Sequence, residues 1–137
     1  DVPLILIGNG TGLAGLRAHM KARIAAGRKR NWLLFGERSA QHDFFHREEV
    51  ERWLAQGMLQ RLDLAFSRDQ AERIYVQDKL REAQEELRRW VEDGAAIYVC
   101  GSLEGMAAGV AQVLHDTLGE ETLETMAANG RYRRDVY

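Results

Sequence analysis

The chain has 137 residues, of which 45% are hydrophobic, and its formal net charge is -2. This length and composition predict one globular domain with a packed core and argue against an intrinsically disordered chain. The nearly balanced charge argues against nucleic acid as the main partner, because no basic excess dominates. No apolar run approaches the length that crosses a bilayer, so we expect no membrane segment in this piece.

Cys100 is the only cysteine, so an internal disulfide cannot form. A single cysteine is compatible with a reducing compartment, and we expect a cytoplasmic location. The sequence opens almost directly on an apolar run and closes on an aromatic residue, Tyr137. We therefore expect it to be one domain, residues 1–137, of a longer protein.

Short apolar runs alternate with longer amphipathic stretches along the chain, which predicts parallel strands joined by helices. Strands are predicted at residues 4–7, 32–35, 58–66 and 95–100, with a last strand or extended tail at 131–137. Helices are predicted from the end of a glycine-rich turn at 8–15 to about residue 26, and at 43–55, 76–91, 106–118 and 121–128. The run at 4–7 is apolar at every position, as in a strand that is covered on both faces.

The glycine-rich turn holds Gly8, Gly10 and Gly12 between the first strand and the first helix. Glycines at such a place let the backbone approach a pyrophosphate at the start of a helix. Ordinary tight turns also use glycine, and the G-x-G-x-x-G fingerprint is not met, because Leu13 stands three residues after Gly10. Thr11 adds a hydroxyl that can bond a ligand or cap the helix. We favour phosphate or nicotinamide contact.

A second polar segment follows the third strand. Ser67-Arg68-Asp69-Gln70 and Arg73-Ile74-Tyr75-Val76-Gln77 offer two guanidinium groups, a hydroxyl and a phenol. Strand ends in open α/β sheets are where ligands bind, and arginine forks match phosphate oxygens. The 2′-phosphoadenosine end of NADPH is one ligand that fits such a set, and a solvated basic turn is an equally good interpretation of this segment alone.

Two further strand ends carry reactive or charged groups. Arg38 follows the second strand and could reach a phosphate, although an ion pair with Glu37 or Asp43 is the simpler reading of this segment alone. Cys100 ends the fourth strand next to Gly101, which opens space for a ligand. A buried cysteine is more often an inert small hydrophobic residue.

The four histidines predict no metal site. Only His42 and His46 are spaced four residues apart, and Asp43 stands where the HExxH motif has glutamate.

Five segments, in the same order, resemble the NADP-binding domain of the ferredoxin–NADP reductase superfamily. The resemblance covers nearly the whole chain and is strongest to the diflavin branch, in particular to flavoprotein subunits of NADPH-sulfite reductases. The segments are Gly8–Gly12, Phe35–Arg38, Ser67-Arg68 with Arg73–Gln77, Tyr98–Gly101, and Arg131–Tyr137.

The resemblance implies a Rossmann-like, doubly wound α/β fold with a five-stranded parallel sheet in the order 3-2-1-4-5. It also implies roles in holding the nucleotide. Ser67, Arg68, Arg73 and Tyr75 are expected to hold the 2′-phosphate, with Tyr75 also near the adenine and Gln77 beside the ribose phosphate; Gly10, Thr11 and Arg38 are expected along the pyrophosphate and nicotinamide half.

The resemblance implies three residues at the reacting end. Cys100 and Asp135 are expected to flank the nicotinamide during hydride transfer, and Tyr137 to stack over the isoalloxazine ring of FAD. Two positions depart from the family pattern: Gly15 replaces a proline, so we expect a looser turn, and Ser102 replaces an aspartate beside the nicotinamide.

The expected function is therefore to bind NADPH and deliver its hydride to FAD in a flavoprotein oxidoreductase. Electrons would then pass through FMN to an acceptor such as a sulfite reductase hemoprotein. The FAD-binding and FMN domains are not part of this sequence, so the isolated domain is expected to be inactive. The alternatives are a related reductase with another acceptor and a non-catalytic NADPH-binding module, in which Tyr137 would have no role.

Overall fold

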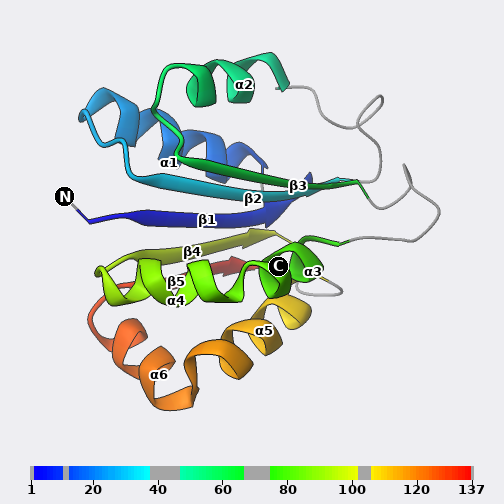
Figure 1. Ribbon diagram of the computed structural model, residues 1–137, viewed down its shortest axis with the longest axis vertical. Coiled ribbons are helices and arrows are strands. Elements are labelled where there is room, and N and C mark those ends of the chain that lie inside the picture. The colour runs from blue at the N-terminus through cyan, green and yellow to red at the C-terminus, as the bar shows by residue number, and fades with distance from the viewer. Residues whose placement is uncertain (1, 11–12, 38–46, 67–74, 102–105, 137) are drawn as a thin grey trace.

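The computed structural model describes residues 2–10, 13–37, 47–66, 75–101 and 106–136. One five-stranded, all-parallel sheet lies between two layers of helices (Figure 1). Its strands are β1 (Leu4–Asn9), β2 (Asn31–Glu37), β3 (Arg61–Phe66), β4 (Ala96–Gly101) and β5 (Tyr132–Val136). The strand order β3-β2-β1-β4-β5 confirms the expected doubly wound topology.

The helices divide between the two faces of the sheet according to which strands they join (Figure 1). The first two, α1 (Leu13–Ala25) and α2 (Arg47–Ala55), cover the face shown uppermost. The opposite face carries α3 (Val76–Glu82), α4 (Gln84–Glu92), α5 (Ala108–Leu118) and α6 (Glu120–Ala128). None of the helices in the described part of the chain is long and apolar enough to cross a membrane.

Two apolar cores follow from this arrangement, one on each face. In β1, Ile5 and Ile7 point into the core under α3–α6, while Leu6 points into the core under α1 and α2. All three side chains are fully buried. Because side chains alternate across a strand, a strand that is covered on both faces must be apolar at every position. This is the physical reason for the unbroken apolar run at 4–7.

The helix predicted at 76–91 is wrong as a single helix. It is interrupted at Ala83, whose backbone leaves the helical region with φ -98° and ψ 22°. Ala83, Leu80 and Leu87 are all buried in the same core, so the apolar stripe continues across the interruption. No glycine or proline marks the site, and packing against the sheet and α5 decides it. Similarly, β3 begins at Arg61 and not at residue 58.

The amino-terminal edge of the sheet is closed by tight connections. Gly27 follows α1 and Gly94 follows α4, both with positive φ, the conformation that commonly ends a helix. Asn31 is fully buried at this edge, and its amide donates to the carbonyls of Arg28 and Met58 at 3.0 and 2.8 Å. These hydrogen bonds hold the start of β2 to the connection before it and to the segment that precedes β3.

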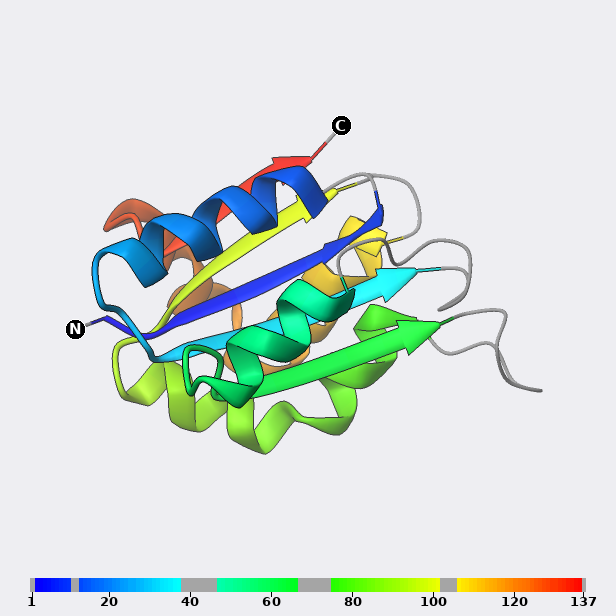
Figure 2. The ribbon, with the colours of Figure 1, turned by 90° about the horizontal axis from the view of Figure 1, so that it is seen from above.

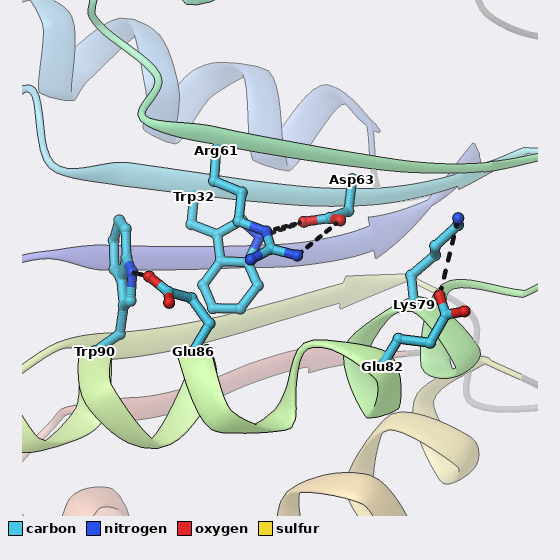
Figure 3. A network of polar contacts seen from close by, with 7 residues as sticks. All are labelled: Trp32, Arg61, Asp63, Lys79, Glu82, Glu86 and Trp90. Carbon is cyan, nitrogen blue, oxygen red and sulfur yellow. Dashed lines mark hydrogen bonds and ion pairs between the residues drawn. The ribbon is translucent and has the colours of Figure 1, made fainter.

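A polar network fixes the edge strand β3 to its neighbours (Figure 3). The fully buried indole of Trp32 donates from Nε1 to Asp63 Oδ2 at 2.7 Å. Arg61 lies over the Trp32 ring, 4.9 Å from its centre, and bonds the same carboxylate at 2.8 Å. On the adjacent helix α4, Trp90 donates to Glu86 at 3.0 Å. The carboxylate of Asp63 thus satisfies a buried donor and pairs with a charge.

Candidate functional site

All five strands point toward the same edge of the sheet, where their carboxyl ends lie side by side (Figure 2). At the centre of this edge β1 and β4 are neighbours, although β2 and β3 separate them in the sequence. The helix after β1 covers one face and the helices that precede and follow β4 cover the other. This is the topological switch point, where open α/β sheets leave a crevice for ligands.

Glycines let β1 and β4 pack closely at the switch point. A Cβ atom at Gly8 would lie 2.5 Å from the carbonyl oxygen of Cys100 and 2.6 Å from Leu16 Cδ1. At Gly101, where φ is +149°, it would meet the side chain of Asn9 and lie 2.7 Å from Met106 Cε. Only glycine fits either position, because backbone and side-chain atoms already fill the space next to both residues, which are buried. This close packing brings the ends of β1 and β4 together at one edge, where Gly10 is exposed after β1.

Cys100 and Asp135 are brought together across β4 and β5. They are direct partners in the parallel ladder, and they lie near the ends of their strands. Cys100 is almost fully buried, whereas Asp135 is exposed on the edge strand. Both residues expected at the nicotinamide therefore occupy one corner of the carboxyl edge.

Tyr98 joins these two side chains. Its hydroxyl donates to Asp135 Oδ2 at 3.3 Å and interacts with the Cys100 thiol as well. Burial, together with the neighbouring Cys100 and Asp135 groups, raises the pKa of Tyr98 to about 12. The phenol is therefore a protonated donor throughout the physiological pH range.

The imidazole of His19 packs edge-on against the Tyr98 ring, with ring centres 4.2 Å apart and planes inclined by 68°. Burial, assisted by the positive charge of Arg133, lowers the pKa of His19 below its ordinary value. The lowered pKa favours the neutral form of the imidazole, which burial between α1 and the sheet costs least.

Gly15 belongs to the same corner. It lies in the first turn of α1, and a Cβ atom there would be 2.9 Å from Cys100 Sγ and 3.8 Å from the Tyr98 hydroxyl oxygen. Gly15 stands where the family pattern has a proline, and in this structure the glycine leaves room for the Cys100 thiol. The looser turn expected from this glycine concerns residues 11–12 as well, which lie outside the described residues.

Tyr75 and Gln77 lie at the start of α3, on the face of the sheet opposite to α1 and α2. Tyr75 is 42% exposed, and its backbone N–H donates to Asp78 Oδ2 at 2.8 Å, which fixes the start of the helix. The carboxamide of Gln77 lies against Gly109 in the first turn of α5, where a Cβ atom would be only 2.9 Å away. Tyr75 thus presents its ring outward, and Gln77 is seated between two helix starts.

Of the remaining predicted site residues, the structure describes one glycine. Gly10 is described and exposed at the end of β1. The others follow strand ends in the sequence but lie outside the described residues: Thr11, Arg38, Ser67, Arg68, Arg73, Ser102 and Tyr137. Among the described residues no three His, Cys, Asp or Glu side chains gather as metal ligands.

Two residues of this corner were not predicted from the sequence, Tyr98 and His19. Tyr98 had a signal, because it stands two residues before Cys100 in a strand and so must share its face. His19 had none, since its contact depends on how α1 packs across β4.

Comparison with known proteins agrees with this geometry. A family model described as "Oxidoreductase NAD-binding domain" matches residues 6–112. The chain is also similar to "Sulfite reductase [NADPH] flavoprotein alpha-component" of Salmonella typhi (47% identical), Yersinia enterocolitica (47%) and Escherichia coli O6:K15:H31 (46%). Each alignment covers 100% of this chain but 25% of the relative, so the chain spans a quarter of the length of these proteins. The chain belongs to the oxidoreductase NAD-binding domain family.

Proposed function

We propose that this domain binds NADPH and presents its nicotinamide to an FAD held by another domain of a longer flavoprotein. The observation that carries the proposal is the pairing of Cys100 with Asp135 at the switch point, where Gly8 and Gly101 let β1 and β4 approach closely. Cys100 also packs in the core under α1 and α2, whereas Asp135 is exposed and belongs to neither apolar core. The relatives are named as NADPH-dependent flavoproteins, which supports the same assignment.

The binding groups are proposed to follow the carboxyl edge from β3 to β4. Tyr75, exposed beside α3, would lie against the adenine, and Gln77 would contact the ribose phosphate. The charged residues of this end would hold the 2′-phosphate: Ser67, Arg68 and Arg73. Gly10, Thr11 and Arg38 would line the pyrophosphate and the nicotinamide half.

At the reacting end this chain orients the nicotinamide, while the bound cofactors supply the hydride chemistry. Cys100 contributes by position at the face of the ring and not by covalent attack. Asp135 contributes negative charge where positive charge develops on the nicotinamide as hydride leaves. Tyr137 would cover the flavin until the nicotinamide displaces it.

The electron acceptor is chosen by domains outside this chain. We propose transfer from FAD through FMN to a sulfite reductase hemoprotein, because the similar proteins are flavoprotein components of that enzyme. This domain would then have two protein partners, its own FAD-binding domain and the hemoprotein.

Calorimetric titration with NADPH and NADH tests nucleotide binding. A charge-assisted hydrogen bond contributes about 1.5–3 kcal/mol, so Arg68→Ala should weaken NADPH roughly ten- to a hundredfold. NADH lacks the 2′-phosphate, so its affinity should stay the same. Arg52→Ala, on the exposed surface of α2, is the matched control and should change neither affinity. Equal affinities for the two nucleotides in the unsubstituted protein would refute the proposal.

A further inference from the structure

The inference in this section rests on the proposed function. The Tyr98 hydroxyl lies between Cys100 and Asp135, the two side chains proposed to act on the nicotinamide. It donates to Asp135 Oδ2 at 3.3 Å and interacts with the Cys100 thiol. Tyr98 itself lies two pairs before Cys100 and Asp135 in the ladder, opposite Arg133, so its side chain reaches toward the strand ends. One donor group therefore bridges β4 and β5 at the site.

The phenol is held in place from two directions. Its ring meets the imidazole of His19 on α1 at a ring-centre distance of 4.2 Å. On the side of α1, Gly15 has no side chain and so leaves space for both groups. A Cβ atom there would lie 3.8 Å from the Tyr98 hydroxyl oxygen and 2.9 Å from Cys100 Sγ. Because a packed ring loses rotational freedom on folding, its hydroxyl is a fixed reference point for the groups that it contacts.

Asp135 needs such a reference point. It lies on the edge strand β5, and its side chain is exposed. A free aspartate on an edge strand samples several rotamers. Its hydrogen bond to Tyr98 selects an orientation toward β4 and Cys100.

We propose that Tyr98 is a positioning residue for hydride transfer, holding the Asp135 carboxylate and the Cys100 thiol in one arrangement at the nicotinamide. Tyr98 does not contact the reacting atoms in this proposal and acts only through these two neighbours. Displacement of reacting or orienting groups by about 1 Å can lower a rate by roughly a hundredfold.

Stopped-flow reduction of the flavin in the full-length protein tests the kinetic part. Tyr98→Phe keeps the ring against His19 and removes only the hydroxyl. It should slow flavin reduction at saturating NADPH about tenfold or more and increase the primary isotope effect with deuterated NADPH, since hydride transfer becomes slower relative to other steps. The affinity for NADP⁺ should stay within twofold. Tyr132→Phe is the matched control, because Tyr132 lies on β5 but packs in the core of the opposite face.

A double variant tests whether Tyr98 acts through Asp135. If it does, the loss of rate in Tyr98→Phe combined with Asp135→Ala should be smaller than the two single losses multiplied together. Fully additive losses would overturn the proposal, as would an unchanged reduction rate and isotope effect in Tyr98→Phe.

NMR of protein labelled at the tyrosine Cζ atoms gives a readout without turnover. Asp135→Ala removes the acceptor and keeps Tyr98, so it should shift the Tyr98 signal, which is identified by its loss in Tyr98→Phe, and leave the Tyr132 signal in place. An unmoved Tyr98 signal would show that the bridge does not exist and would overturn the positioning role. Failure of the unsubstituted protein to bind NADP⁺ would instead overturn the proposed function, so the two failures are distinguishable.

Discussion

Gly8→Ala tests the close approach of β1 and β4 on which the site depends. The added Cβ atom would lie 2.5 Å from the Cys100 carbonyl oxygen, and an ordinary contact of 3.4 Å requires the two atoms to separate by about 0.9 Å. The carbonyl belongs to the backbone of β4, which pairs with β1 residue by residue from Leu4 to Gly8, so it cannot swing aside. Overpacking of this kind costs about 1–3 kcal/mol.

The expected change in thermal stability follows from the size of the chain. With an unfolding entropy of about 2.1 cal/mol/K per residue, each kcal/mol lowers the Tm of 137 residues by about 3.5 °C. Gly8→Ala should therefore lower the Tm, followed by circular dichroism, by roughly 3–10 °C. Gly36→Ala is the matched control, because its Cβ atom would lie 3.4 Å from Val76 Cβ, an ordinary contact. Equal changes in Tm for the two variants would refute the steric argument.

Two further predictions concern stability. Asp63→Ala should lower the free energy of unfolding in urea by about 1–3 kcal/mol, because it leaves the buried Trp32 N–H without its acceptor. Glu82→Ala, which breaks only an exposed pair, should cost less than about 0.5 kcal/mol, and equal losses would contradict the account (Figure 3). At high pH, an unfolded tyrosine loses its proton near pH 10.0 while folded Tyr98 keeps it to about pH 12, so stability should fall as pH rises through this window. Tyr98→Phe should flatten that fall by up to roughly 1.4 kcal/mol per pH unit, and an unchanged slope would rule out the raised pKa.

Much of the fold could be predicted because local sequence patterns indicate its strands and helices. The unbroken apolar runs of β1 and β4 predict buried parallel strands, and the alternation with amphipathic stretches predicts helices on both faces. Where packing overrides local preference, prediction failed. Nothing at Ala83 indicates an interruption, since alanine favours helix and the apolar stripe continues past it.

For the site, the sequence predicted some of the residues but not the contacts between them. Cys100 and Asp135 were expected to act together, and the β4–β5 pairing places them opposite each other. The place of Tyr98, two residues before Cys100, indicates that they share a face of the strand, but its contacts with Asp135 and His19 depend on the register of β5 and on the packing of α1. Gly15 was recognised as a departure, but its consequence needed the position of the Cys100 thiol.

The central claim is that nucleotide binds at the carboxyl edge of the sheet. Its most direct test is to follow the backbone amide NMR signals of the ¹⁵N-labelled domain during titration with NADP⁺. We predict saturable shifts at Gly10, Gln77 and Gly101, which lie at that edge, and none at Gly27 or Gly94 at the opposite edge. Saturable shifts confined to the amino-terminal edge, or none at either edge, would contradict the account.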